Sequence, residues 1–83
     1  MNLYVISGVT GMTGNELARQ LIKKGHKVIG FDNFFASTIQ TVSDLTDNKN
    51  FIFHEYDLNN KEQMRELKKE VEKVKAFLAD QTI

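Results

Sequence analysis

The hydrophobic positions of this chain fall into three short continuous runs that are separated by longer, mostly polar stretches. Continuous runs, as opposed to strict alternation, are typical of strands covered on both faces, as in a parallel sheet. The pattern predicts strands at 3–6, at 28–31 and from 51 to about 56.

Helical spacing follows the first run and returns weakly after the second. A helix is predicted from four apolar positions, Leu17, Ala18, Leu21 and Ile22. The two lysines after them, followed by Gly25, are typical of a helix C-terminus. A weaker pattern permits a short helix through Ile39, Val42 and Leu45. Strands that alternate with helices predict right-handed crossovers and therefore an α/β fold with a parallel sheet.

The segment from Lys61 onward has two interpretations. A helical stripe runs through Met64, Leu67, Val71, Val74 and Leu78. Four i,i+3 pairs support a helix, namely Glu62–Arg65, Glu66–Lys69, Glu70–Lys73 and Glu72–Lys75. Asn60 with Gln63 reads as an N-cap pair before it. This interpretation predicts one helix over about 61–78. The other ends the helix near Lys73 and makes 74–79 a fourth strand.

Composition places the chain among small globular domains. We expect a single domain over residues 1–83, because a chain of 83 residues forms one small domain at most. Eleven basic and eleven acidic residues cancel, which argues against a dedicated nucleic-acid or membrane-surface binder. The absence of cysteine excludes disulfides and thiolate zinc sites. No apolar run is long enough to span a membrane, and we expect a cytoplasmic protein.

A metal site at the end of the third predicted strand is not expected either. His54, Glu55 and Asp57 are close in sequence. Successive side chains of a strand point to opposite faces, so His54 faces away from the two carboxylates. We therefore predict no metal ligands in this chain.

The glycines carry the first sign of a function. All five lie in the first 30 residues, and Gly8, Gly11 and Gly14 follow the first predicted strand and open the first predicted helix. A helix N-terminus presents unpaired N–H groups and the positive end of the dipole, which together bind a diphosphate. Gly8 would allow the tight turn, Gly11 a close approach of the phosphates, and Gly14 close packing of the helix. The hydroxyls of Ser7, Thr10 and Thr13 are candidate hydrogen-bond donors. The alternative is that the glycines only make the loop flexible.

Asp32 strengthens the dinucleotide interpretation. It ends the second predicted strand, 18 residues after Gly14. A carboxylate there can accept hydrogen bonds from both hydroxyls of an adenosine ribose and repels a 2′-phosphate, which favours NAD over NADP. The loop has no Gly-Lys-Ser/Thr sequence, so it is not a Walker-type nucleotide site.

The spacing Ser7-Gly8-x-x-Gly11-x-x-Gly14 resembles the signature of the extended short-chain dehydrogenase/reductases, the NAD-dependent nucleotide-sugar epimerases and dehydratases. Three further segments resemble that family, namely 25–33, Asp57-Leu58 and 78–82. The last resembles the family's fourth-strand segment, so the resemblance favours a strand at 74–79. The resemblance implies a Rossmann-like three-layer half-domain with a parallel sheet of three or four strands. It also implies NAD contacts from Thr10, Met12, Thr13 and Asn33, from Asp57 and Leu58 beside the adenine, and from Leu78 and Ala79 under the cofactor.

The chain also departs from that family. Its enzymes use a Tyr-x-x-x-Lys pair, but Tyr4 is followed at the fourth position by Gly8 and Tyr56 by Asn60. Family enzymes are also longer and carry a sugar-binding lobe. We therefore expect a truncated, NAD-binding portion without turnover. One alternative is a stand-alone nucleotide-binding module. Another is an interaction protein that forms a homo-oligomer through its C-terminal helix or an exposed sheet edge.

Overall fold

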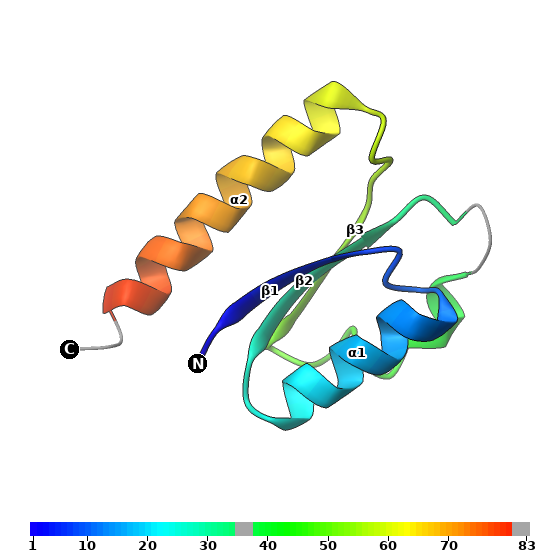
Figure 1. Cartoon of the computed structure of the whole chain (residues 1–83), viewed down its shortest axis with the longest axis horizontal. Helices are drawn as coiled ribbons and strands as arrows, with labels where there is room; N and C mark the ends of the chain where they lie inside the picture. Colours follow the sequence, from blue (N-terminus) through cyan, green and yellow to red (C-terminus); the bar gives the residue numbers. More distant parts are fainter. Residues whose placement is uncertain (35–37, 81–83) are drawn as a thin grey trace.

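The computed structural model describes residues 1–34 and 38–80, apart from the side chain of Asp80. The elements alternate as the sequence predicts: β1 (Leu3–Ser7), α1 (Met12–Lys23), β2 (Lys27–Asp32), a 3-10 helix η1 (Ile39–Val42), β3 (Phe51–Glu55) and α2 (Lys61–Asp80). The three strands are parallel and lie in the order β1-β2-β3 (Figure 1). This order is one half of the doubly wound Rossmann arrangement, in which the first strand lies in the interior of the sheet.

The central strand sets the register of the sheet. Ile29 of β2 lies opposite Val5 of β1 and Ile52 of β3. Helix α1 and the η1 segment cover one face, and α2 covers the other (Figure 1). The third strand ends at Glu55, one residue before the predicted end. The predicted helix at 39–45 is a short 3-10 helix followed by turns.

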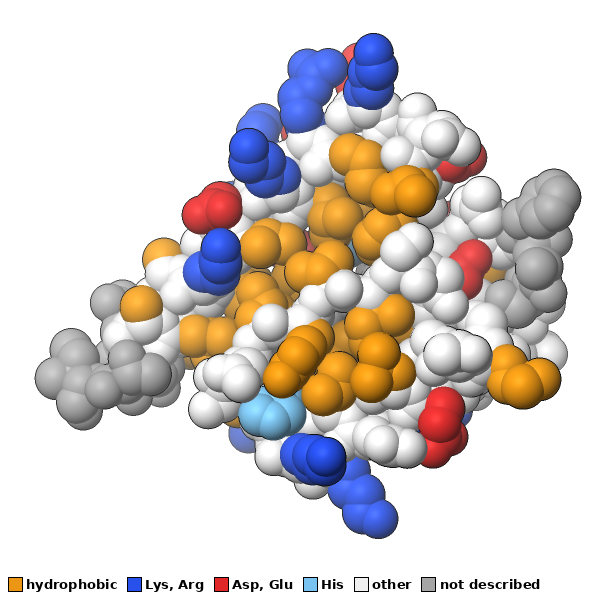
Figure 2. All heavy atoms as spheres, in the orientation of Figure 1, with side chains coloured by type: hydrophobic (Ala, Val, Ile, Leu, Met, Phe, Trp, Pro, Cys, Tyr) orange, Lys and Arg blue, Asp and Glu red, His pale blue; other side chains and the backbone are white. Residues whose placement is uncertain are grey.

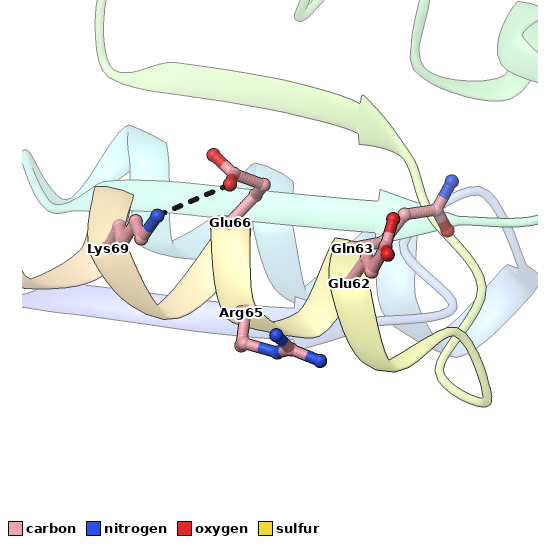
Figure 3. A pocket seen from close by; sticks show the side chains of 5 residues that line it. All are labelled: Glu62, Gln63, Arg65, Glu66 and Lys69. Carbon is pink, nitrogen blue, oxygen red and sulfur yellow. Dashed lines mark hydrogen bonds and ion pairs between the residues drawn. The ribbon is translucent and has the colours of Figure 1, made fainter.

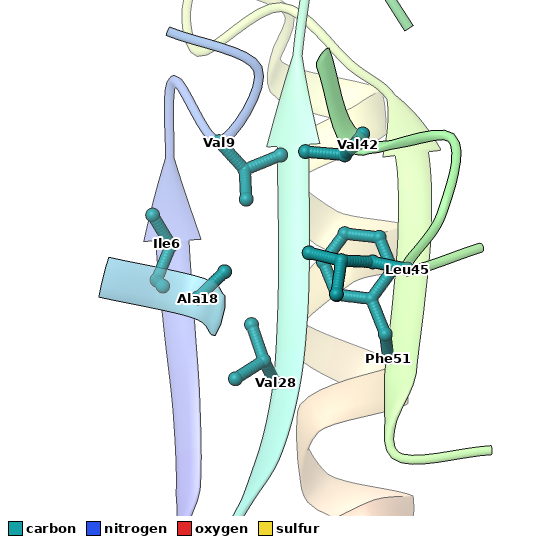
Figure 4. Packing of buried hydrophobic residues seen from close by; sticks show 7 residues of the cluster. All are labelled: Ile6, Val9, Ala18, Val28, Val42, Leu45 and Phe51. Atoms are coloured by element: carbon teal, nitrogen blue, oxygen red, sulfur yellow. The ribbon is translucent and has the colours of Figure 1, made fainter. Parts of the chain in front are cut away.

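The core on the α1 face is built mostly from small and β-branched side chains, with one leucine and one phenylalanine (Figure 4). Its buried members are Ile6, Val9, Ala18, Val28, Val42, Leu45 and Phe51. Val9 lies directly over Gly30 of β2, where an added Cβ would come within 2.7 Å of a Val9 methyl group. Only a residue without a side chain leaves room for Val9. Gly30 therefore allows the glycine loop, of which Val9 is part, to pack directly against β2.

The core on the α2 face is more open. Ile29, Phe31 and Leu67 are its buried members. Partly buried side chains complete it, including Leu3, Ile52, Met64, Val71 and Val74. Figure 2 shows hydrophobic side chains gathered between α2 and β1. In the described residues the outer edge of β1 has no strand beside it.

Both helices have ends that the sequence signals. The N–H of Gln63 donates to Asn60 Oδ1 over 3.0 Å, which confirms Asn60 as the cap of α2. In a capping box the side chain of Gln63 would accept the N–H of the cap residue, Asn60. Here Gln63 Oε1 accepts the N–H of Asp57 over 2.7 Å. Helix α1 ends at Lys23, and Gly25, the residue after the C-cap Lys24, has φ of 88°. The N–H of Gly25 bonds to Ile22 O and that of His26 to Leu21 O, which is a Schellman motif.

The fourth strand that the family resemblance favoured is absent from the described residues, because α2 continues to Asp80. The helical stripe of Leu67, Val71 and Val74 faces the sheet and decides the matter in favour of a helix. Of the predicted i,i+3 pairs, Glu66–Lys69 and Glu72–Lys75 form at 3.5 and 3.9 Å. Glu70 instead pairs with His54 of β3. Gln81 and Thr82 of the family segment lie outside the described residues.

Candidate functional site

The glycine loop joins β1 to α1 at the end of the sheet where the strands terminate. Gly8 has φ of 70°, as expected for the glycine of the tight turn. Its N–H donates to the carbonyl oxygen of Phe31 over 2.9 Å, and its own carbonyl accepts the N–H of Gly11 over 3.0 Å. The loop is therefore folded back on itself and fastened to β2, and is not merely a flexible connection.

Gly14 is the most constrained glycine of the loop. A Cβ at this position would collide with the carbonyl oxygen of Gly8 and lie 2.9 Å from Val9 Cα. At Gly11 the same atom would lie 3.3 Å from the Gly8 oxygen, a milder crowding. The close contact at Gly14 is between the first turn of α1 and the loop backbone, so this glycine allows the close helix packing that the spacing predicts.

The N-terminus of α1 carries no side-chain cap. Gly11 is the N-cap residue, and the first turn holds no acidic side chain. Met12 and Thr13 lie exposed on this turn. The backbone N–H groups of a first helical turn have no partner within the helix, and the dipole makes this end positive. Such an end fits an anionic group, and here the glycines keep side chains out of its way.

Asp32 lies beside this loop at the end of β2, with 9% of its surface exposed. Its Oδ2 accepts the N–H of Thr10 over 3.0 Å and the Thr10 hydroxyl over 2.5 Å. Its Oδ1 accepts the N–H of Phe34 over 2.9 Å. Thr10 was predicted to offer its hydroxyl to the cofactor, but in the structure this hydroxyl donates to Asp32.

These contacts determine the ionisation of Asp32. Burial by itself raises the pKa of the carboxyl, but hydrogen bonds outweigh it. The Thr10 hydroxyl and the backbone N–H groups of Phe34, Thr10 and Asn33 together lower the pKa of Asp32 below its ordinary value of 3.8. The group is therefore a carboxylate at neutral pH and acts as an acceptor of hydrogen bonds.

A small hollow of about 100 Å³ adjoins this carboxylate. Its lining includes four of the predicted cofactor-binding residues, Gly8, Asp32, Asn33 and Leu58, and also Ser7, Phe31 and Tyr56. Leu58 keeps 63% of its surface exposed. Asp57 is not part of this lining, and its Oδ1 accepts the N–H of Asn59 over 2.8 Å. Sequence reasoning did not assign Tyr56 to a site, although Tyr56 directly follows β3 and directly precedes Asp57, which the family motif did single out.

Leu78 and Ala79 lie elsewhere. Together with Lys75 of α2 they line a hollow of about 440 Å³ against residues 1–4, at the start of β1. The glycine loop follows the other end of that strand. The structure therefore does not bring Leu78 and Ala79 together with Gly8 and Asp32, because the segment 74–79 is part of α2 and not a strand beside β1.

A further hollow lies on the outer side of α2 (Figure 3). It has a volume of about 350 Å³ and is lined by Glu62, Gln63, Arg65, Glu66 and Lys69. All of these side chains come from one helix, and most are exposed and charged. All the residues that line it are polar or charged, whereas a ligand site is lined mostly by hydrophobic and aromatic side chains, so we do not assign this hollow to a ligand.

His54 contacts Glu70 and Tyr56, and not the two carboxylates next to it in the sequence, Glu55 and Asp57. Its Nε2 lies 2.6 Å from Glu70 Oε1, and its ring stacks on Tyr56 at 4.6 Å between centroids. The imidazole thus links β3 to α2. Among the described residues no three His, Cys, Asp or Glu side chains gather in a group that would hold a metal ion. The described helices include none that is long and apolar enough to cross a membrane.

Comparison with known proteins gives this geometry a context. A model of the GDP-mannose 4,6-dehydratase family matches residues 5–77. An uncharacterised 37.6 kDa protein of Escherichia coli O111:H- is 32% identical over 68 residues, which cover 77% of this chain and 20% of that protein. The chain thus spans about a fifth of the length of this curated relative.

Solved structures agree on the fold. The dTDP-glucose 4,6-dehydratase of Bacillus anthracis in complex with NAD superposes with a TM-score of 0.76 at 20% identity, over 84% of this chain and 24% of that one. The UDP-Glc/GlcNAc 4-epimerase of Campylobacter jejuni gives 0.72 at 28% identity, and the UDP-glucose 4-epimerase of Thermotoga maritima with UDP-glucose gives 0.67 at 27%. Each epimerase match covers 81% of this chain and 20% of the epimerase. The Rossmann-like prediction is confirmed.

Proposed function

Since this chain belongs to the GDP-mannose 4,6-dehydratase family, among the NAD-dependent epimerases and dehydratases, we propose that it holds NAD by the adenosine diphosphate half. The diphosphate would lie at the open N-terminus of α1, over Gly11 and the first turn. The adenosine ribose would lie in the hollow beside Asp32, with Leu58 and Asn33 at its rim. Leu78 and Ala79 have no part in this proposal, because they line a hollow at the opposite end of β1.

The observation that carries the proposal is that two groups of the protein lie side by side, each of which suits a different part of one ligand. An uncapped helix N-terminus and a buried carboxylate lie side by side, joined through Thr10. The first suits a diphosphate and the second suits a neutral diol. Only a molecule that carries both groups a short distance apart uses both features, and the ADP-ribose part of NAD is such a molecule.

The same carboxylate would select between cofactors. Asp32 is ionised at neutral pH, because its hydrogen bonds lower its pKa. A 2′-phosphate on the ribose would bring a second negative charge next to it. Like charges in close contact cost several kcal/mol, so we expect NAD to be preferred over NADP.

The redox step itself would need groups that these 83 residues do not supply. The Tyr-x-x-x-Lys pair of the family does not occur among them. The proposal therefore assigns binding and orientation of the cofactor to this chain, and assigns it no proton transfer and no sugar contact.

Calorimetric titration with NAD and with NADP tests the proposal. We expect saturable one-to-one binding of NAD and at least about tenfold weaker binding of NADP. Asp32→Ala should weaken NAD binding and narrow the difference between the two cofactors. A loss of fold would weaken the binding of NAD and of NADP by the same factor. The ratio of the two affinities therefore reports on the ribose contact. Asp47→Ala, at an exposed aspartate outside the site, is the matched control. A folded chain that binds neither cofactor would refute the proposal.

A further inference from the structure

The segment that follows β2 is bonded to the glycine loop through one hydroxyl. Thr41 Oγ1, on η1, donates to the carbonyl oxygen of Thr10 over 2.7 Å. A hydroxyl has a single hydrogen to donate. The other acceptor within its reach, the Thr38 carbonyl, is farther away at 3.0 Å. The bond to Thr10 is therefore the principal one.

The Thr10 carbonyl belongs to a peptide unit that matters for the site. The N–H of the same unit is that of Gly11, the N-cap of α1, and it donates to the Gly8 carbonyl over 3.0 Å. Because a peptide unit is planar, a bond that fixes its oxygen also fixes the direction of its N–H. Thr41 and Gly8 thus hold this peptide at both ends, just where the first turn of α1 begins.

Thr10 also holds the carboxylate of Asp32. Its N–H and hydroxyl both donate to Asp32 Oδ2, and Thr10 is almost fully buried. A shift of the Thr10 backbone would therefore move the start of α1 and the carboxylate together. One residue connects the part of the site that suits a diphosphate to the part that suits a ribose.

The η1 segment is itself fastened on two sides. Val42, next to Thr41, is fully buried in the core of the α1 face. Arg19 of α1 donates through Nη2 to the carbonyl oxygen of Thr41 over 2.6 Å and forms an ion pair with Asp44. Asn15 completes the connection, because its Oδ1 accepts from Arg19 Nε and its Nδ2 donates to the Gly11 carbonyl.

From these contacts we propose that Thr41 is a positioning residue of the nucleotide site. It does not touch the nucleotide, and it acts by fixing the Thr10–Gly11 peptide and, through Thr10, the Asp32 carboxylate. This inference rests on the proposed function. It predicts that η1 influences affinity, although η1 contributes no residue to the hollow beside Asp32.

The test compares four forms of the chain: wild type, Thr41→Val, Thr41→Ser and Thr46→Val. Valine removes the hydroxyl and keeps the shape, and serine restores the hydroxyl. Thr46 is the matched control, because it lies in the turns directly after η1, is exposed, and donates its hydroxyl to a local carbonyl, that of Ser43, over 2.8 Å. Affinity for ADP-ribose is measured by calorimetry, and amide hydrogen exchange at Gly11 is measured without ligand.

We expect Thr41→Val to weaken ADP-ribose binding about tenfold and to speed exchange at Gly11 by a similar factor, because it leaves a buried carbonyl without its donor. Thr41→Ser and Thr46→Val should stay within about twofold of wild type in both measurements. Equal affinity and exchange in Thr41→Val and wild type would overturn the inference and leave the proposed function intact. A wild-type chain that binds no ADP-ribose would overturn the proposed function, and with it the assigned role of Thr41.

Discussion

The two faces of the sheet differ in how their contacts are made. On the face under α1, contacts are made directly on glycine backbone, with Gly14 against the Gly8 carbonyl and Gly30 under the Val9 side chain. On the face under α2, contact is made by long side chains, and Leu67 is the one residue of that helix that is buried in the described structure. The first face tolerates almost no added atom. The second has only the open, partly buried packing of a helix laid on a strand surface.

The difference indicates where precision is needed. Groups that bind a nucleotide must be held within a fraction of an ångström of the productive geometry. The glycine loop and Asp32, which we propose as the nucleotide site, are fixed in this way by steric contact and by hydrogen bonds from Thr10 and Thr41. Helix α2 covers apolar surface, a task that depends on area more than on exact position. Substitutions on the two faces should therefore differ in how much they change the free energy of unfolding and in whether they change nucleotide affinity.

The largest effect is expected at Gly14. Gly14→Ala should destabilise the chain by about 3 kcal/mol or more, because the new Cβ meets backbone atoms that cannot rotate away. Gly25→Ala is the comparison: its φ of 88° is unfavourable for alanine, but no atom lies within 4 Å of the added Cβ. We expect it to cost about 1 kcal/mol. Denaturant unfolding measures both, and equal losses would contradict the steric account of the loop.

Asp32 is expected to give the next largest effect and a dependence on pH. Asp32→Asn should cost about 2 kcal/mol at neutral pH, since hydrogen bonds to a charged acceptor are weakened. The folded pKa is lowered relative to the unfolded chain, so this stabilisation is complete above the ordinary pKa of 3.8 and is lost as the pH falls through the folded pKa. Unfolding measured between pH 2 and pH 7 should show a shallower acid decline in the variant. An unchanged decline would show that Asp32 is not hydrogen-bonded in this way.

The cap of α2 should contribute less. Asn60→Ala removes the acceptor for the N–H of Gln63 and should cost about 1 kcal/mol. Asn60→Asp, which keeps an acceptor in the same place, is the control and should remain near wild type. Because α2 lies apart from the glycine loop, we expect neither change to alter NAD affinity once the chain is folded. If Asn60→Ala changed the free energy of NAD binding by more than it changed the free energy of unfolding, the two faces would not be independent as described.

The smallest effect is expected on the outer surface of α2. Glu66→Gln removes the exposed pair with Lys69 and should change the unfolding free energy by no more than about 0.5 kcal/mol. The side chains around it form the hollow on the outer side of α2 (Figure 3). NAD affinity unchanged by this substitution would agree with the assignment of that hollow to solvated surface. A clear loss of affinity would place the nucleotide on α2.

The sequence predicts the elements well because their signals are local. The three apolar runs, the cap at Asn60 and Gly25 after α1 all lie where the structure has strand, cap and helix end. The C-terminal segment shows that the hydrophobic stripe was a better guide than similarity to a family motif. That motif pointed to a strand at 74–79, whereas Val71 and Val74 face the sheet from a helix.

Contacts between distant residues could not be predicted in the same way. Thr10 and Asp32 are 22 positions apart and Thr10 and Thr41 are 31 apart, and nothing in their local sequence marks them as partners. Sequence reasoning singled out Gly8, Gly14 and Asp32 as site candidates because their spacing is a known pattern. It missed Gly30 and Thr41, whose importance arises only when the loop folds onto β2 and η1 folds onto the loop.

The most direct test of the account is a map of amide chemical-shift changes when the ¹⁵N-labelled chain is titrated with NAD. We expect saturable changes at Gly8, at residues 11–14, and at Asn33 and Leu58, with none at residues 75–79. That outcome would locate the cofactor between the N-terminus of α1 and the carboxylate of Asp32. Changes that gather instead at residues 1–4 and 75–79, or a folded chain with no saturable change, would contradict the account.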